Sequence, residues 1–163
     1  DVSVFWSIEM STNITPTNLR LSGERKIQLE EIAQLTGAGS MSAAIGELIK
    51  LAREQGLVDH GIPGVAINSF CDGMAISFDD ATPTSFSHEG VAALAATIRE
   101  FVNGAEQAKV THNLDHDFSV SRRGTSFKVA IPENSATPKT WAADIALEFA
   151  DLIEAESMKA KAA

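Results

Sequence analysis

The sequence has few of the features that mark secreted or membrane proteins. Cys71 is its one cysteine, so no disulfide can form within the chain, which fits a reducing compartment. No apolar run approaches the roughly 18 residues that a bilayer-spanning helix needs, so we expect no membrane association. The N-terminus lacks a basic segment before an apolar core, and we therefore expect no signal peptide. These absences predict a cytoplasmic protein.

Positive charge is also scarce. The chain carries 13 Lys and Arg against 22 Asp and Glu, a net charge of −9. Residues 12–62 hold five of these cations and six of the anions, whereas residues 63–163 hold eight and fourteen. A nucleic-acid ligand requires a basic face. Only the nearly neutral first part, where Arg20, Arg25 and Lys26 lie close together, is suited to such a ligand.

Three segments differ in composition. Residues 1–11 are mainly apolar before Met10, which has the features of a natural start, and we expect them to be a non-native extension or an additional edge strand. Residues 12–62 contain helical patterns. The Gly-Ile-Pro-Gly sequence at 61–64 is a typical break between domains, and we place the boundary of an acidic second domain, residues 63–163, within it.

A short alternating segment, residues 18–21, precedes two helical patterns. Leu19 and Leu21 lie on one side of the expected strand, and Asn18 and Arg20 lie on the other. Two apolar stripes at helical spacing follow, and both are bounded by typical capping residues. The residues expected to begin and end the two helices are Ser22, Gly37, Ser40 or Ser42, and Gly56.

A strand this short leaves unpaired N–H and C=O groups on both edges. We expect the same strand of a second molecule to pair with it in antiparallel fashion. The resulting ribbon carries Asn18 and Arg20 twice on its outer face. A two-stranded ribbon fits the major groove of B-DNA, where Arg binds guanine and Asn binds adenine. The start of the second helix, with Ser40 and Ser42, can hold a backbone phosphate.

Residues 18–57 resemble a ribbon–helix–helix domain of the Arc/MetJ type. The matching features are Asn-Leu-Arg in the strand, the apolar stripe of the first helix, a glycine turn and the sequence SAAIGELI that opens the second helix. The resemblance implies an obligate homodimer whose strands read bases and whose second helix contacts phosphate. Carried over to this chain, base reading falls to Asn18, Arg20 and the position of Pro16, and phosphate contact to Ser40, Met41 and Ser42. Pro16 departs from the family pattern because proline has no N–H for the ribbon.

Arg25 and Lys26 are further candidates for phosphate contact, since both lie in the first turn of the first expected helix. Arg122 and Arg123 lie at the tip of an expected hairpin, where they are either solvated or available to an acidic partner.

Residues 63–163 predict an acidic α+β domain built from a duplicated β-β-α unit. At an offset of 51 without gaps, Gly73 aligns with Gly124 and Ile98 aligns with Phe149. Two such units can form one four-stranded antiparallel sheet with both helices on one face. The expected strands are 65–70, 74–78, 118–120 and 126–131, and the expected helices are 88–102 and 138–156. Since its acidity repels phosphate, we expect this domain to project away from DNA and to serve oligomerisation or partner binding.

Two polar groupings are weak candidates for catalytic or metal chemistry. His112 and His116 are spaced i, i+4, but their segment reads as a loop and shows no third ligand. Cys71 could be a nucleophile with His60 or His88, yet no feature of the sequence brings these groups together. We therefore expect no catalytic residue, no metal and no cofactor.

The sequence thus predicts an α+β transcriptional regulator, a repressor rather than an enzyme. It would bind double-stranded DNA sequence-specifically as a homodimer, which could assemble further into a tetramer. The alternative is an antitoxin, or a plasmid partition or relaxosome accessory protein, whose residues 63–163 bind a protein partner. An enzyme built on the second domain is a third class, and it requires a polar pocket that the sequence does not reveal.

Overall fold

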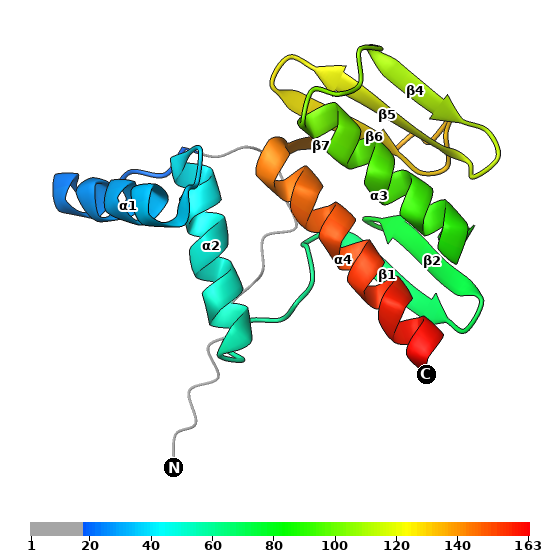
Figure 1. Cartoon of the computed structure of the whole chain (residues 1–163), viewed down its shortest axis with the longest axis horizontal. Coiled ribbons are helices and arrows are strands. Elements are labelled where there is room, and N and C mark those ends of the chain that lie inside the picture. The colour runs from blue at the N-terminus through cyan, green and yellow to red at the C-terminus, as the bar shows by residue number, and fades with distance from the viewer. Residues whose placement is uncertain (1–17) are drawn as a thin grey trace.

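The computed structural model describes residues 18–163, which form an α+β arrangement of four helices and two antiparallel sheets (Figure 1). The helices are α1 (Gly23–Thr36), α2 (Met41–Glu54), α3 (His88–Val102) and α4 (Ala143–Ala162). The strands are β1 (Val65–Phe70), β2 (Gly73–Phe78), β3 (Thr84–Ser87), β4 (Val110–Asn113), β5 (Phe118–Arg123), β6 (Ser126–Ala130) and β7 (Lys139–Ala142). The expected extension, residues 1–11, and the candidate base reader Pro16 lie outside the described residues.

Local capping signals set the limits of α1 and α2. The side chain of Ser22 caps α1, and Gly37 ends that helix in the left-handed conformation, with φ 70°. The Ser40 hydroxyl accepts a 3.1 Å hydrogen bond from the backbone N–H of Ala43 and so caps α2. Ser22, Gly37 and Ser40 are thus confirmed as helix limits, with Ser40 rather than Ser42 as the cap of α2, whereas α2 ends at Glu54, before the expected Gly56.

Residues 18–22 form neither helix nor strand in the described chain. Their last residue, Ser22, has extended backbone angles, φ −66° and ψ 158°. A strand is defined by its pairing with another strand, and the two sheets of the described chain consist of β1 to β7 alone. The strand expected at 18–21 is therefore not observed, and the two-stranded ribbon stays a prediction.

Two separate sheets replace the single four-stranded sheet that the sequence predicted. One has the strand order β1-β2-β3 and the other the order β4-β5-β6-β7. The sequence did not predict β3, β4 and β7, because alternation over four residues is too short to identify a strand. β7 occupies residues that were expected to begin the last helix, which starts instead at Ala143.

A β-β-β-α unit occurs twice, whereas the sequence predicted two β-β-α units. Phe70 pairs with Gly73 across the first hairpin, and the equivalent pair of β5 and β6 lies 53 positions later. Ser87 directly precedes α3, and Ala142 directly precedes α4, 55 positions later. The predicted gapless offset of 51 is wrong by two positions in the hairpins and by four at the helices.

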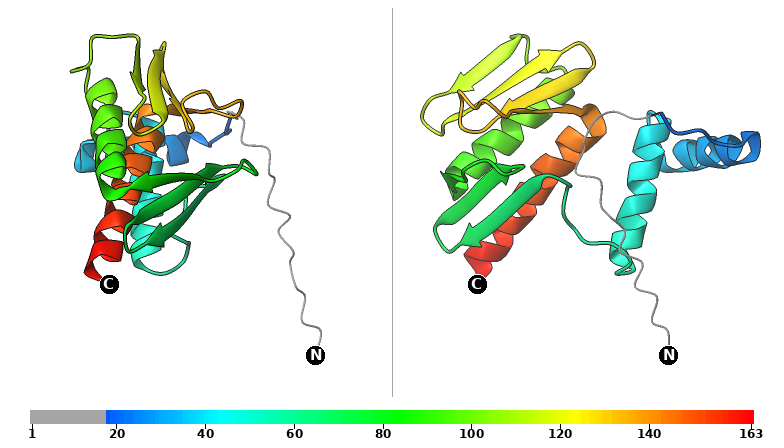
Figure 2. Two further views of the ribbon diagram at one scale, coloured as in Figure 1. Left: turned by 90° about the vertical axis from the view of Figure 1, so that its right-hand side faces the viewer. Right: turned by 180° about the vertical axis from the view of Figure 1, so that it is seen from behind.

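One hydrophobic core holds both units together. α3 and α4 lie side by side, and both sheets lie on the same side of this helix pair (Figures 1 and 2). The ring of Phe78 lies 5.4 Å from that of Trp141 and 5.7 Å from that of Phe149, both in edge-to-face geometry. Full burial of one such side chain contributes about 1.5–3 kcal/mol, so the aromatic cluster joins the two sheets to α4.

Candidate nucleic-acid interface

α1 and α2 bury little apolar surface. No residue of α1 is buried, and Ala44 is the one buried residue of α2. Most helical stability in proteins comes from packing of an apolar face, so this helix pair requires a cover. Exposed apolar side chains on the pair and on the segment before it are Leu19, Leu21, Ile27, Leu35, Leu48, Ile49 and Leu51.

α2 has two faces of different chemistry. Ile45, Leu48, Ile49 and Ala52 recur every three or four residues and so share one face. Leu48 and Ile49 are 38% and 42% exposed, although both are large and apolar. The face that borders α4 carries small or charged residues instead, namely Ala43, Gly46, Glu47, Lys50, Arg53 and Glu54. Within residues 18–163, α4 therefore leaves the apolar face of α2 uncovered.

The predicted base readers, Asn18 and Arg20, are exposed. Arg25 donates through Nη1 to Oε1 of Gln28 at 2.8 Å, and Nζ of Lys26 lies 3.6 Å from Oε1 of Glu30. Exposed contacts of this kind contribute about 0–1 kcal/mol. Arg25 and Lys26 can therefore exchange these partners for phosphate with little penalty.

Glu24 adds a negative charge at the start of α1. Its own backbone N–H and the Ser22 hydroxyl hold the pKa of its carboxyl below the ordinary value of 4.5. The carboxylate is therefore ionised at neutral pH, and its negative charge interacts favourably with the positive, N-terminal end of the helix dipole.

Ser40, Met41 and Ser42 lie together at the N-terminal end of α2, where a helix presents backbone N–H groups that can bind an anion. The Ser40 side chain is committed to capping. The Ser42 hydroxyl donates a 2.9 Å hydrogen bond to Oδ2 of Asp144, which belongs to the first turn of α4. The structure thus places a carboxylate of the acidic half beside the predicted phosphate site.

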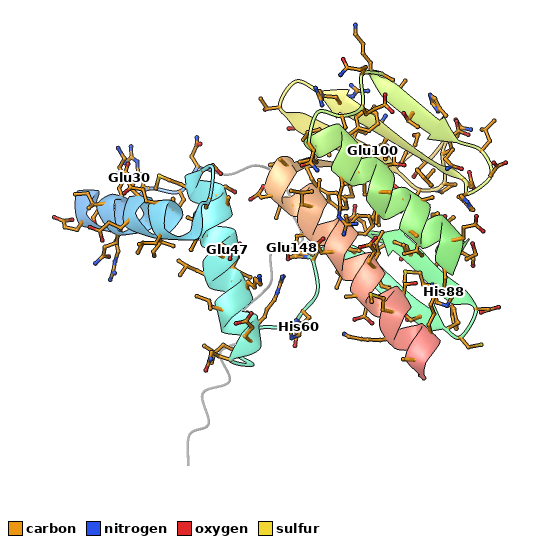
Figure 3. All side chains as sticks on the ribbon, viewed as in Figure 1. Glu30, Glu47, His60, His88, Glu100 and Glu148 are labelled. Carbon is orange, nitrogen blue, oxygen red and sulfur yellow. The ribbon has the colours of Figure 1, made fainter. Side chains whose placement is uncertain are left out.

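Arg53 joins the other end of α2 to α4 and to the linker. It donates to Oε1 of Glu148 on α4, and to the backbone carbonyls of Asp59 at 3.0 Å and Gly61 at 2.9 Å. Its side chain is 16% exposed. Figure 3 shows Glu148 between the two helices. α4 of the acidic half thus contacts α2 near both of its ends, and the expectation that this half projects away from DNA stays a prediction.

His88 braces the β1–β2 turn against α4. Its Nδ1 lies 2.6 Å from the hydroxyl of Ser157, and its Nε2 lies 3.0 Å from the carbonyl oxygen of Cys71. A carbonyl can only accept, so Nε2 carries the proton and Nδ1 accepts from Ser157 when the ring is neutral. Ser157 is only 5% exposed. The pair of His88 and Ser157 therefore has a structural role. His88 contacts the backbone carbonyl of Cys71 through Nε2.

His112 and His116 contact different neighbours. Nδ1 of His112 lies 2.6 Å from a carboxylate oxygen of Glu133, whereas His116 packs beside Gly90 of α3. Among residues 18–163, no group of three or more His, Cys, Asp or Glu side chains is arranged to hold a metal ion.

No helix within residues 18–163 has the length and apolar character required to cross a bilayer.

Asp144, Glu148 and Arg53 were not predicted as site residues. The sequence feature that could have indicated Asp144 is an acidic residue early in the last helix. Acidic residues are common in the first turn of helices because the helix dipole favours them there, so this feature does not identify a site. No family model matches the chain, and no curated protein or solved structure matches it either, so any proposal on function depends on the residues described above.

Proposed function

We propose that the chain is a sequence-specific DNA-binding regulator that acts as a homodimer. Its ribbon consists of residues 18–21 of two copies, and it enters the major groove of a two-fold symmetric operator. The observation that supports this most is the set of exposed apolar side chains on α1 and on one face of α2, which directly follow an exposed segment with Asn18 and Arg20. Regulation is by occupancy, because a bound dimer blocks transcription without making or breaking a bond.

A second copy is the cover that fits this apolar face best. The two copies present the same exposed side chains to each other, including Leu48 and Ile49. Residues 12–62 hold five cations and six anions, so two copies of this part repel each other weakly. A stable dimer buries about 1,200–2,000 Å² in total, so we expect the interface to extend over the exposed apolar residues of both helices.

Dimerisation also completes the DNA-binding surface. It brings together two copies of Asn18 and Arg20, each of which can form a bidentate contact worth about 1–3 kcal/mol of base discrimination. It doubles the cations Arg25 and Lys26 at the flanks, and it provides two α2 N-termini for backbone phosphates.

Oligomeric state and DNA binding together test the proposal. The wild-type chain should have twice the monomer mass by light scattering, whereas Leu48→Glu/Ile49→Glu should have the monomer mass and lose DNA binding. Leu114→Glu, an exposed site in the β4–β5 turn, is the control and should behave as wild type. The DNA affinity of the wild type should fall steeply with salt. A wild-type chain that is monomeric at micromolar concentration would rule the proposal out.

The second candidate is an antitoxin, or a plasmid partition or relaxosome accessory protein, whose second half binds a protein partner. Phe70 and Met158 are 54% and 70% exposed. His88 joins the residues that follow Phe70 and precede Met158, so the two apolar side chains belong to one region of the surface. A partner that copurifies with the wild type but not with Phe70→Ser/Met158→Ser would support this candidate.

A further inference from the structure

We propose that α4 closes the phosphate-binding end of α2, so that the described chain is the autoinhibited state of the DNA-binding surface. This inference depends on the proposed function and adds its regulation. It concerns the contact of Asp144 and Glu148 with Ser42 and Arg53.

The Asp144 carboxylate occupies the position of a DNA phosphate. Both groups are anions that accept hydrogen bonds from the same donors. Asp144 accepts from the Ser42 hydroxyl at 2.9 Å, and it lies in the first turn of α4. It therefore lies close to the N-terminal ends of both α2 and α4. A phosphate cannot take the Ser42 hydroxyl while Asp144 holds it.

The contact between Arg53 and Glu148 holds α4 beside α2. Arg53 binds Glu148 and two linker carbonyls at once, so the end of α2, the linker and α4 are held by one guanidinium. The next carboxylates along α4, Asp151 and Glu154, bind Arg99 of α3 instead. Asp144 and Glu148 are thus the α4 carboxylates that make these polar contacts with α2.

In the closed arrangement, negative charge of the second half would also repel the phosphates of DNA. Residues 63–163 hold fourteen anions and eight cations, and Asp144 of α4 lies beside the predicted phosphate site. Movement of α4 away from α2 would free Ser42 and remove this repulsion. The apolar face of α2, with Leu48 and Ile49, is directed away from α4, so the dimer can form in either state.

DNA that binds only the open state has its affinity reduced by the fraction of open molecules. The contacts that close the chain are few and partly exposed. Removal of two such contacts changes an equilibrium by a factor of about 5–30. Asp144→Ala/Glu148→Ala should therefore bind a duplex selected by the wild-type chain about 5–30-fold more tightly.

The control is Glu89→Ala/Glu100→Ala. It removes the same charge from α3, and Glu89 lies in the first turn of α3 as Asp144 lies in that of α4. Its affinity should change by less than about twofold, since exposed charges far from the ligand are screened. Equal tightening in both variants would show a net-charge effect and overturn the inference. Equal affinity of the wild type and Asp144→Ala/Glu148→Ala would also overturn it, and would leave the proposed function intact.

A second measurement needs no DNA. Trypsin cleaves after Arg53, whose side chain is held by three partners in the closed state. Cleavage there should be about 5–30-fold faster in Asp144→Ala/Glu148→Ala than in the control, by the same shift in the open fraction. If cleavage accelerates but neither variant binds any duplex, closure is supported and its role in DNA binding fails with the proposed function. Unchanged cleavage would overturn the closure itself.

Discussion

Phe78 of β2 and Trp141 of β7 belong to different sheets, yet their rings meet edge to face with centroids 5.4 Å apart. Phe149 of α4 contacts both rings. The two copies of the β-β-β-α unit therefore share one aromatic cluster. A single unit would bury much less apolar surface, which gives a physical reason for the repetition.

Loss of this cluster should destabilise the second half strongly. Phe78→Ala should lower the free energy of unfolding by about 3–5 kcal/mol, because it leaves a cavity beside Trp141 and Phe149. Urea denaturation followed by circular dichroism measures the change. Phe70→Ala at an exposed site is the control, and its effect should stay within about 0.5 kcal/mol. A double-mutant cycle with Trp141→Ala should give a coupling of at least about 0.5 kcal/mol. No coupling would contradict the contact.

Two glycine substitutions should have opposite effects. A Cβ at Gly73 would lie 2.0 Å from the backbone oxygen of Phe86, so Gly73→Ala should force β2 and β3 apart and destabilise the fold by about 1–3 kcal/mol or more. A Cβ at Gly46 meets nothing within 4 Å, and Gly46→Ala should stabilise α2 by up to about 1 kcal/mol. Thermal denaturation of both variants tests the β2–β3 pairing, which a neutral Gly73→Ala would contradict.

The stabilising contribution of Arg99 should depend on pH. Arg99 donates 2.6 Å and 2.7 Å hydrogen bonds to Glu154 and Asp151, and the bond from Arg99 holds the pKa of the Glu154 carboxyl below its ordinary value of 4.5. A carboxyl with a lowered pKa stabilises the folded state above its unfolded pKa, and this contribution is lost as pH falls through the folded pKa. The wild type should therefore be more stable than Arg99→Gln at about pH 7, and the difference should shrink toward about pH 3. A constant difference across this range would show that the pairing contributes nothing.

Helix limits could be predicted from the sequence because they depend on local chemistry. Ser22, Gly37 and Ser40 act within three or four residues of their own positions. The short strands β3, β4 and β7 could not be predicted, because each is defined by its pairing with a neighbouring strand. Lys139 pairs with Val129, a residue of the β5–β6 hairpin that lies ten positions earlier in the chain.

In the candidate site, too, local features could be predicted from the sequence and contacts between distant residues could not. The position of Ser40, Met41 and Ser42 at a helix start follows from capping. The hydrogen bond from Ser42 to Asp144 spans 102 positions, and no spacing pattern indicates it. Asn18 and Arg20 require a second copy of the chain for the pairing that would make their segment a strand.

Selection of bound DNA from random duplexes, with the wild type and Arg20→Ala, tests the central claim most directly. The wild type should enrich an inverted repeat, as two-fold symmetry requires. Arg20→Ala should lose the preference at one defined position of each half-site and keep the rest, since each bidentate arginine contributes about 1–3 kcal/mol at its own base. The same selection is run in parallel with Asp144→Ala/Glu148→Ala. If the closed state of the wild type binds DNA too weakly to enrich a duplex, this variant should still enrich one. Failure of the wild type and of this variant to enrich any sequence would contradict the account.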